Sequence, residues 1–311
     1  MSTIDSIRSR VTERSDDAGH PLGGLLRPPR LLMLPMVLLL LFMFVGPMVA
    51  IVVFSVQTGN AISLNPLDWT LAHYAEVIGG MLSGQGVYGQ VLVNTVLVSI
   101  TTTVITLLVS YPAAYALARK IDRYKLVFLM ILIIPLFTSV NIRVFGWALF
   151  LVKNGVLDSI VSLFGVSNYP TLMYQRSTII LGTVYVYLPF MLFPIYLSIL
   201  SIDDATFEAA NDLGATKATV FRKILLPMSF PGVVIGSLFV FVLSLGADVE
   251  AKILGGGSIF TMASNIQYSF GYSQNWPLGS AQAIGLLLIT VVAGIIILRT
   301  IDLQEIASRG D

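Results

Sequence analysis

Six long runs of uncharged, mostly apolar residues constrain this chain more than any other feature. A helix needs about 20 apolar residues to cross a bilayer, and each run is long enough. The runs are Leu31–Val56, Val87–Ala118, Leu126–Val152, Ser177–Ile202, Ile224–Ala247 and Leu278–Leu298. Only 11% of the residues are charged, whereas soluble domains carry about a quarter. The sequence therefore excludes a water-soluble globule and predicts an all-α integral membrane protein with six transmembrane helices.

The segments outside these runs define the expected domain organisation. Residues 1–30 form a polar, arginine-containing head that we interpret as disordered, residues 31–300 form the transmembrane domain, and residues 301–311 form a tail. The first apolar run is about twice as long as the apolar part of a cleaved signal peptide, so we expect it to remain as a helix. Ile253–Pro277 is uncharged but polar and rich in glycine, and we expect a loop there.

The positions of lysine and arginine predict the orientation of the helices. If the N-terminus is cytoplasmic, fourteen of the eighteen Lys and Arg residues lie on the cytoplasmic side and three lie outside. The remaining one, Arg143, interrupts the third run. Cytoplasmic loops of membrane proteins are enriched in these residues. The sequence therefore predicts that both termini are cytoplasmic.

Several kinds of chemistry have no residues to support them. The chain has no cysteine, and its two histidines, His20 and His73, are far apart in sequence, so we expect no metal site. The GxxxxGK[ST] phosphate loop and the HExxH and GxSxG motifs do not occur. We therefore expect no enzyme activity and no cofactor bound by this chain. Because no long basic run occurs, we expect no nucleic-acid partner.

The segment Asp203–Pro227, between the fourth and fifth runs, is the most informative part of the chain. Asp203 or Asp204 can cap a helix N-terminus, and Glu208-Ala209-Ala210 favours a helix. Gly214 is expected to end that helix in a left-handed conformation, which glycine adopts readily. The segment therefore predicts a short helix followed by a turn.

A second short helix is expected over Thr216–Leu225, leading to Pro227 at the membrane. In the first helix, Phe207, Ala210 and Leu213 recur every three residues and predict an apolar stripe. Such a helix suits docking into a groove of a soluble partner. An amphipathic helix resting on lipid headgroups is an equal alternative from the pattern alone.

The same segment carries a known signature. Glu208-Ala209-Ala210, Gly214 and Ile224-x-Leu226-Pro227 match EAA-x3-G-x9-I-x-L-P at every anchor. This pattern resembles the signature of permease subunits of binding-protein-dependent ABC importers, over residues 31–300. Ser110-Tyr111-Pro112 with Ala118-Arg119, the Pro135 to Ile142-Arg143 stretch, Leu188-Pro189-Phe190 and Asn275-Trp276-Pro277-Leu278-Gly279 look most like the spermidine/putrescine branch.

The resemblance implies a type I ABC importer permease fold in the bacterial inner membrane. It implies partners: ABC ATPase subunits that use ATP and Mg, a second permease subunit, a periplasmic solute-binding protein and membrane lipid. The residues that would couple to the ATPase, implied by the same resemblance, are Glu208, Ala209, Ala210, Gly214 and Phe221.

Three charged residues near the predicted outer face are candidates for the substrate path or an outer gate. At 1.5 Å per residue, Arg143 would lie about 27 Å along a helix from Lys125, and Asp248 about 36 Å along one from Ile224. Arg143 either extends to the outer headgroups or pairs with Asp248 or Glu250. If the fifth helix continues, Asp248 and Lys252 are spaced i, i+4 and satisfy each other. Glu250 is then the less compensated carboxylate.

These carboxylates and the resemblance together predict a polyamine substrate. The alternatives are an ABC permease for another solute, such as an opine, a phosphonate compound or ferric iron. An ion-coupled secondary transporter is less favoured, because the sequence shows neither an internal repeat nor ionisable residues near the membrane midplane.

Overall fold

The computed structural model describes residues 30–59, 68–84, 86–121, 123–165 and 170–299. The chain divides into two units, residues 1–50 and residues 51–311. The predicted head and tail lie outside the described residues, apart from Arg30. Helix α2 (Arg30–Ser55) is the described part of the first unit, and its last residues extend past the boundary between the units. Its side chains from Met36 to Phe44 are apolar and more than half exposed, as expected for a helix surrounded by lipid.

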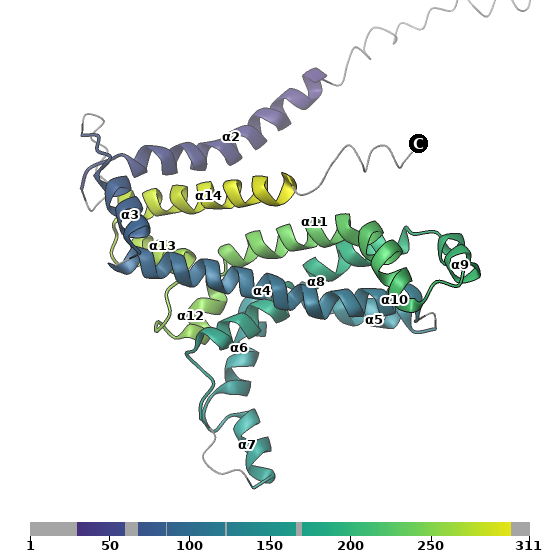
Figure 1. The fold of residues 1–311 in the computed structure, drawn as a ribbon. Coiled ribbons are helices and arrows are strands. Elements are labelled where there is room, and N and C mark those ends of the chain that lie inside the picture. The colour runs from purple at the N-terminus through teal and green to yellow at the C-terminus, as the bar shows by residue number, and fades with distance from the viewer. Residues whose placement is uncertain (1–29, 60–67, 85, 122, 166–169, 300–311) are drawn as a thin grey trace, which may run out of the picture. The chain divides into compact units, whose positions relative to one another are not determined.

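The second unit consists of helices, which Figure 1 shows along the chain. The helices of its first half are α3 (Ala72–Ser83), α4 (Gly86–Arg119), α5 (Lys125–Ile133), α6 (Val140–Leu151) and α7 (Val156–Leu163). Those of its second half are α8 (Arg176–Leu200), α9 (Asp204–Asp212), α10 (Lys217–Val220), α11 (Leu226–Leu245), α12 (Val249–Gly255), α13 (Met262–Gly271) and α14 (Trp276–Arg299).

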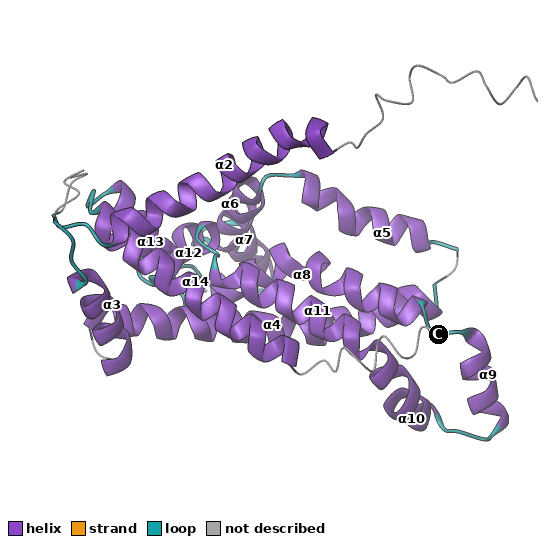
Figure 2. Cartoon of the chain, turned by 90° about the horizontal axis from the view of Figure 1, so that it is seen from above, coloured by secondary structure: helices purple, strands orange, loops and turns teal. Residues whose placement is uncertain are grey.

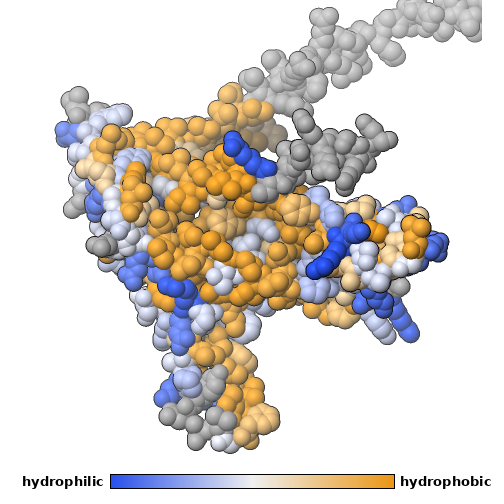
Figure 3. All heavy atoms as spheres, in the orientation of Figure 1, coloured by the Kyte–Doolittle hydropathy of each residue, from blue (hydrophilic) through white to orange (hydrophobic). Residues whose placement is uncertain are grey.

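Six segments of the described chain are long and apolar enough to cross a membrane. They are Pro35–Ser55, Gly86–Arg119, Val140–Leu163, Arg176–Leu200, Lys217–Leu245 and Trp276–Ile297. The prediction of six apolar spans is confirmed. In Figure 3, hydrophobic side chains cover most of the visible face, and hydrophilic ones lie mainly toward its edges, among them the edge around α9 and α10. The apolar surface is what a bundle surrounded by lipid requires, because lipid cannot solvate polar groups.

Helices α4, α8 and α11 pack against one another and form the core of the second unit (Figure 2). Close approach depends on small residues, because a Cβ atom added at Gly232 of α11 would lie 2.5 Å from the carbonyl oxygen of Pro194 in α8. Hydroxyl groups also join the helices: Thr102 bonds Thr183 at 2.7 Å. Small residues and buried hydroxyl pairs are typical of helix packing in membranes.

The third predicted run does not form one helix. Its helix α5 passes into a 3-10 turn at Ile134–Phe137, and Thr138 is extended, with φ −96° and ψ 139°. Pro135 explains the break, because proline lacks the amide hydrogen that a continuous helix would use. The estimate that placed Arg143 about 27 Å along an unbroken helix is therefore wrong. Arg143 lies in the first turn of α6.

Two further expectations at the end of α11 are wrong. The helix ends at Leu245, with Gly246 as its C-cap, so Asp248 does not lie on a continuous helix that starts at Ile224. The segment expected to be a loop, Ile253–Pro277, contains the end of α12, all of α13 and the start of α14. The hydroxyl of Thr261 caps α13 by accepting a bond from the amide of Ser264 at 3.4 Å. This cap gives a polar segment a defined helical start.

Candidate functional site

The segment Asp203–Pro227, which we name the coupling loop, folds as two short helices. Asp203 caps α9, and its carboxylate accepts a bond from the amide of Ala205 at 3.2 Å. Thr216 caps α10, and a π-helical turn at Phe221–Leu225 then leads into α11. The first expected helix is confirmed. The second begins after Thr216 as expected but does not end at Leu225, because it continues into α11 as one span from Lys217 to Leu245.

Gly214 makes the turn between the two helices. Its φ is 72°, in the left-handed region, as the sequence predicted. The amide of the next residue, Ala215, donates to the carbonyl of Ala210 at 3.0 Å and closes the end of α9. A Cβ atom at Gly214 would meet no atom within 4 Å, so the need for glycine comes from the backbone conformation alone.

The candidate coupling residues lie on different faces of the loop. Glu208 and Ala209 are exposed, whereas Ala210 is only 8% exposed and packs inside the chain. Leu213 is 88% exposed. The expected apolar stripe is therefore divided, because α9 ends at Asp212 and Leu213 lies beyond its last turn. Leu213, which was not among the candidate coupling residues, is the most exposed apolar side chain of the loop.

Phe221, the fifth candidate coupling residue, lies at the base of the loop. Its ring contacts that of Tyr111 edge to face, with centroids 5.9 Å apart. The hydroxyl of Tyr111 in turn bonds that of Ser229 at 2.9 Å, so Phe221 joins the coupling loop to α4 and α11. Phe221 is also 42% exposed, so part of its ring remains open to a partner.

The three candidate gate residues lie beyond the coupling loop. Arg143 belongs to α6, and Asp248 and Glu250 lie at the start of α12, after the end of α11. Glu250 of α12 is 1% exposed, and one of its carboxylate oxygens has no hydrogen-bond partner. Burial raises the pKa of Glu250, while the hydroxyl of Tyr187 and the guanidinium of Arg143 act in the opposite direction. Among the described residues, no ion pair within 4.0 Å joins Arg143 to Glu250 or Asp248. Arg143 and Glu250 thus interact by charge without a direct contact.

Asp248 and Lys252 do not satisfy each other through their side chains. The ammonium group of Lys252 instead donates to the side-chain oxygen of Gln267 at 2.8 Å, and one oxygen of Asp248 is buried without a hydrogen-bond partner. Asp248 and Lys252 are still one helical turn apart, since the amide of Lys252 donates to the carbonyl of Asp248 at 2.9 Å, but the Lys252 side chain bonds Gln267 and the expected pair is wrong. Glu250 is therefore not the only uncompensated carboxylate.

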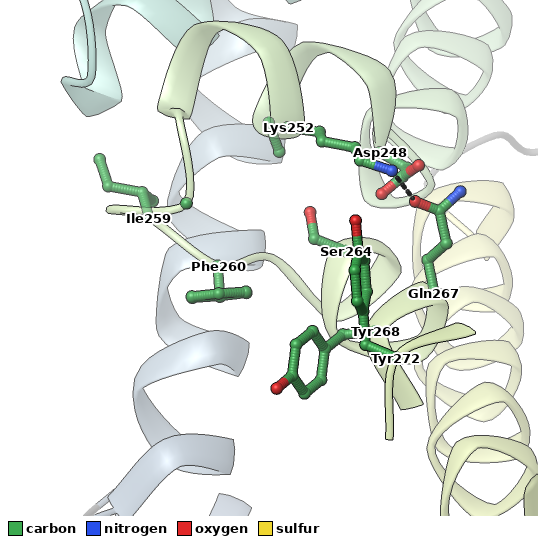
Figure 4. Close-up of a pocket in the computed structure, with 10 residues that line it drawn as sticks. Asp248, Lys252, Ile259, Phe260, Ser264, Gln267, Tyr268 and Tyr272 are labelled. Atoms are coloured by element: carbon green, nitrogen blue, oxygen red, sulfur yellow. Dashed lines mark hydrogen bonds between the residues drawn. The ribbon is translucent and has the colours of Figure 1, made fainter. Parts of the chain in front are cut away.

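A cavity of about 180 Å³ opens beside Asp248 (Figure 4). Besides Asp248, Lys252 and Gln267, it is lined by the rings of Phe260, Tyr268 and Tyr272. The two tyrosine rings stack with centroids 5.5 Å apart, and the ring of Phe260 meets that of Tyr268 edge to face at 6.4 Å. The aromatic residues belong to the segment expected to be a loop, so sequence reasoning missed them.

Hydrogen bonds fix this segment to the bundle. The amide of Met262 donates to the hydroxyl of Thr95 at 2.8 Å, and the amide group of Asn94 donates to the carbonyl of Phe260 at 3.2 Å. Asn265 bonds Gln282 of α14 at 3.0 Å. The cavity wall is therefore held by α4 and α14. In the described part of the chain, no three His, Asp or Glu side chains converge as a metal site would require.

Comparison with known proteins assigns a family to this arrangement. Residues 77–303 match the family described as "Binding-protein-dependent transport system inner membrane component". The chain belongs to this family. It is a permease subunit of an ABC importer, a multi-pass protein of the bacterial inner membrane and a transport subunit without enzyme activity of its own.

Several bacterial permease proteins are similar to this chain in sequence. "Spermidine/putrescine transport system permease protein PotB" of Salmonella typhimurium is 33% identical over 261 residues, covering 84% of this chain and 88% of PotB. PotB of Haemophilus influenzae is 30% identical over 251 residues, covering 80% and 86%. The inner membrane ABC transporter permease protein YdcU of Escherichia coli is 27% identical, covering 62% and 65%.

Solved structures share the fold. A chain of the "bacterial alginate ABC transporter in complex with alginate pentasaccharide-bound periplasmic protein" superposes with a TM-score of 0.68 and 17% identity, covering 86% of this chain and 91% of that chain. At this identity the likeness concerns the fold alone. The fold class predicted from the sequence, a six-span all-α ABC importer permease, is confirmed.

Proposed function

We propose that this chain is the membrane path for organic cations of the polyamine class. A periplasmic solute-binding protein delivers the substrate, a second permease subunit completes the path within the lipid bilayer, and ABC ATPase subunits dock at the coupling loop and hydrolyse ATP with Mg. The names of the PotB relatives support the substrate class. The comparison structure, titled as a complex with a periplasmic protein, supports the delivery step.

The exposed side of α9 supports docking of an ATPase. Among the described helices, none packs along the length of α9, and Figures 1 and 2 show it standing at the end of the bundle. Glu208, Ala209 and Leu213 are exposed there. A small apolar and acidic surface that the chain itself leaves uncovered is available to a soluble partner. Leu213 is the side chain we expect to enter the partner's groove.

The cavity beside Asp248 is the observation on which the substrate proposal rests. Aromatic faces and a carboxylate are the groups that attract an alkylammonium ion, the first through the ring quadrupole and the second by charge. The chain's own primary ammonium, from Lys252, already lies in this cavity. Its flexible four-carbon stem lets it leave when a substrate ammonium arrives. The carboxyl group of Glu250, two residues after Asp248, is buried and is not part of the cavity wall.

Uptake by the complete transporter in proteoliposomes tests this proposal. Glu250→Gln and Asp248→Asn should each impair polyamine uptake while the ATPase subunits still copurify. Lys252→Met should lower the polyamine concentration that gives half-maximal uptake, because it removes the competing ammonium. Glu76→Gln is the matched control, since Glu76 is an exposed carboxylate on α3 that bonds Tyr88 outside the cavity.

Two results would contradict the proposal. Unchanged uptake in both carboxylate variants would remove the site. A cognate binding protein that prefers an anion would remove the substrate class.

We also propose that both termini are cytoplasmic, which places the coupling loop on the ATPase side. The distribution of Lys and Arg supports this orientation. Reporter fusions at Gly59, Lys120, Ala215 and Gly257 should read outside, inside, inside and outside. A periplasmic signal at Ala215 would contradict docking of an ATPase at the coupling loop.

A further inference from the structure

Arg119, the last residue of α4, makes an unusual set of contacts at the base of the coupling loop. One terminal nitrogen of its guanidinium group donates to the carboxylate of Asp204, the first residue of α9. The other donates to the backbone carbonyls of Ile199 and Ile202, at the end of α8. A single side chain therefore joins the ends of α4 and α8 to the start of α9.

The ring of Phe207 completes this arrangement. The guanidinium carbon of Arg119 lies 4.5 Å from the centroid of that ring, one turn into α9. Phe207 also packs against the buried cluster that includes Ile199 and Ile202. The side chain of Arg119 is 15% exposed and that of Asp204 is 84% exposed. The carbonyl groups at the end of α8 thus hold the guanidinium on one side, and the carboxylate and the ring from α9 hold it on the other.

The rest of α9 is attached more loosely. A cavity of about 440 Å³ lies between the inner side of α9 and the helices behind it. Its wall includes Phe207 and Asn211 on α9, Tyr115 on α4 and Phe221 before α11. At its far end, α9 is followed by Gly214, which has a left-handed backbone conformation. No atom lies within 4 Å of the position that a Cβ atom would take there. Ala210, near the end of α9, is buried, but among the described residues the side-chain hydrogen bond from α9 to another helix is made at its start, by Asp204.

We propose that Arg119 is the positioning residue through which displacement of α9 moves α4 and α8. This inference rests on the proposed docking of the ATPase at the coupling loop. A force applied to the exposed side of α9 reaches the bundle only through contacts that do not yield. The planar guanidinium fork holds three acceptors and a ring at once, which a lysine ammonium does not. Without it, α9 would move into the cavity, and ATP hydrolysis would no longer be linked to the spans.

The test measures substrate uptake and ATP hydrolysis in the same proteoliposomes containing the complete transporter. Arg119→Gln should leave subunit assembly and ATP hydrolysis in the absence of substrate intact. The amount of substrate moved per ATP should fall about tenfold, within the usual range of couplings between sites. Arg119→Lys should give an intermediate loss. Asp204→Asn should reduce the ratio only about twofold, because its ion pair is exposed.

Arg123→Gln provides the matched control. Arg123 is an exposed arginine four residues after Arg119, and its guanidinium lies 5.6 Å from the ring centroid of Tyr124. It should leave the ratio unchanged. An unchanged ratio in Arg119→Gln, or an equal loss in Arg123→Gln, would overturn the proposal.

A second measurement applies if Arg119→Gln fails to assemble. Because the chain has no cysteine, spin labels can be attached to single cysteines introduced at Lys120 and Asp212 of the full chain. Arg119→Lys should broaden the distribution of distances between the labels, since an ammonium group cannot hold the three acceptors and the ring at once. A distribution as narrow as that of the chain with Arg119 would overturn the role of the Arg119 contacts.

A variant of Leu213, the exposed residue directly after α9, separates this inference from the proposed function. Leu213→Asp should prevent copurification of the ATPase if the coupling loop is the docking site. If Leu213→Asp had no effect on copurification or uptake, the docking proposal would fail. If Leu213→Asp prevented copurification while Arg119→Gln kept the normal ratio, only the role of Arg119 would fail.

Discussion

The two segments that flank α11 are both built from short helices, yet they are held in different ways. The coupling loop before α11 is attached at the start of α9 by Arg119 and has an exposed outer side. The segment after α11 is joined by hydrogen bonds to α4 and α14 around the start of α13, and its helix α12 packs against α6 and α8. Its central residues, including Glu250 and Met262, are fully buried.

We interpret this difference through the proposed function, in which one end receives the ATPase and the other holds the substrate. A segment that receives a partner needs a free surface and one firm attachment, because displacement must be transmitted without being lost in the segment itself. A segment that holds small cations needs fixed groups, because charge and aromatic contacts depend on position. The helices α4, α8 and α11 connect both segments. Four substitutions test this comparison, ordered from the largest expected effect to the smallest.

Gly214→Val should abolish uptake while the chain still inserts in the membrane. A β-branched residue is strained at a φ of 72°, by about 1–3 kcal/mol, and the turn after α9 would change shape. Copurification of the ATPase and uptake are the measurements. Gly79→Val is the control, since a Cβ atom there also meets nothing within 4 Å and α3 has ordinary helical geometry. Normal uptake by Gly214→Val would show that transport does not need the left-handed turn after α9.

Gly232→Ala should lower the free energy of unfolding by about 3 kcal/mol, near the upper end for overpacking. The added methyl group would lie 2.5 Å from the Pro194 carbonyl oxygen and 2.6 Å from Cβ of Ser198. Thermal unfolding in detergent measures the effect. Gly294→Ala is the control in another span, where the nearest atom is 3.8 Å away. Equal melting temperatures for the two variants would mean that α8 and α11 are not in close contact.

Thr95→Val should lower the free energy of unfolding by about 1–2 kcal/mol, because the buried amide of Met262 loses its acceptor. It should also weaken polyamine uptake by loosening α13. Thr103→Val serves for comparison, because the Thr103 hydroxyl bonds the Ser99 carbonyl within its own helix. If both threonine variants behaved alike in unfolding and uptake, the bonds to α4 would not be what fixes α13.

Glu250→Gln should change the pH dependence of stability. Burial raises the pKa of Glu250 above the ordinary value of 4.5. The protonated carboxyl therefore stabilises the folded chain below the unfolded pKa, and this contribution is lost as pH rises through the folded pKa. The variant does not titrate, so its melting temperature relative to the unsubstituted chain should rise as the pH increases above the ordinary pKa of 4.5. A difference that stays constant with pH would contradict the burial of an ionisable Glu250.

Much of the fold followed from the sequence because membrane spans are specified locally. A run of about 20 apolar residues has no other stable arrangement in a bilayer than a helix. The caps of α9 and α10 and the left-handed Gly214 were predictable for the same reason, since each depends on a few neighbouring residues. Proline chemistry predicts a kink at Pro135, but the sequence did not show that the chain becomes extended at Thr138, because the effect of a proline in a membrane helix depends on the surrounding helices.

The sites were predicted less completely. The EAA signature identified the coupling loop, but the sequence did not show that Ala210 faces inward while Leu213 faces outward. The pairing expected between Asp248 and Lys252 does not form, because the Lys252 side chain bonds Gln267 instead. The aromatic cavity was missed because Phe260, Tyr268 and Tyr272 lie in a polar, glycine-rich segment, which is typical of loops.

The sequence by itself determined the membrane class, the number of spans, the position of the coupling loop and the family, because these depend on composition and on patterns of adjacent residues. Only the tertiary structure decided which distant residues meet. Arg119 lies 80 residues or more from Ile199, Ile202 and Asp204, and Thr95 lies 167 residues from Met262. Such contacts depend on how the helices α4, α8 and α11 pack against one another. Packing depends on the shape of whole helix surfaces, which no single stretch of sequence specifies.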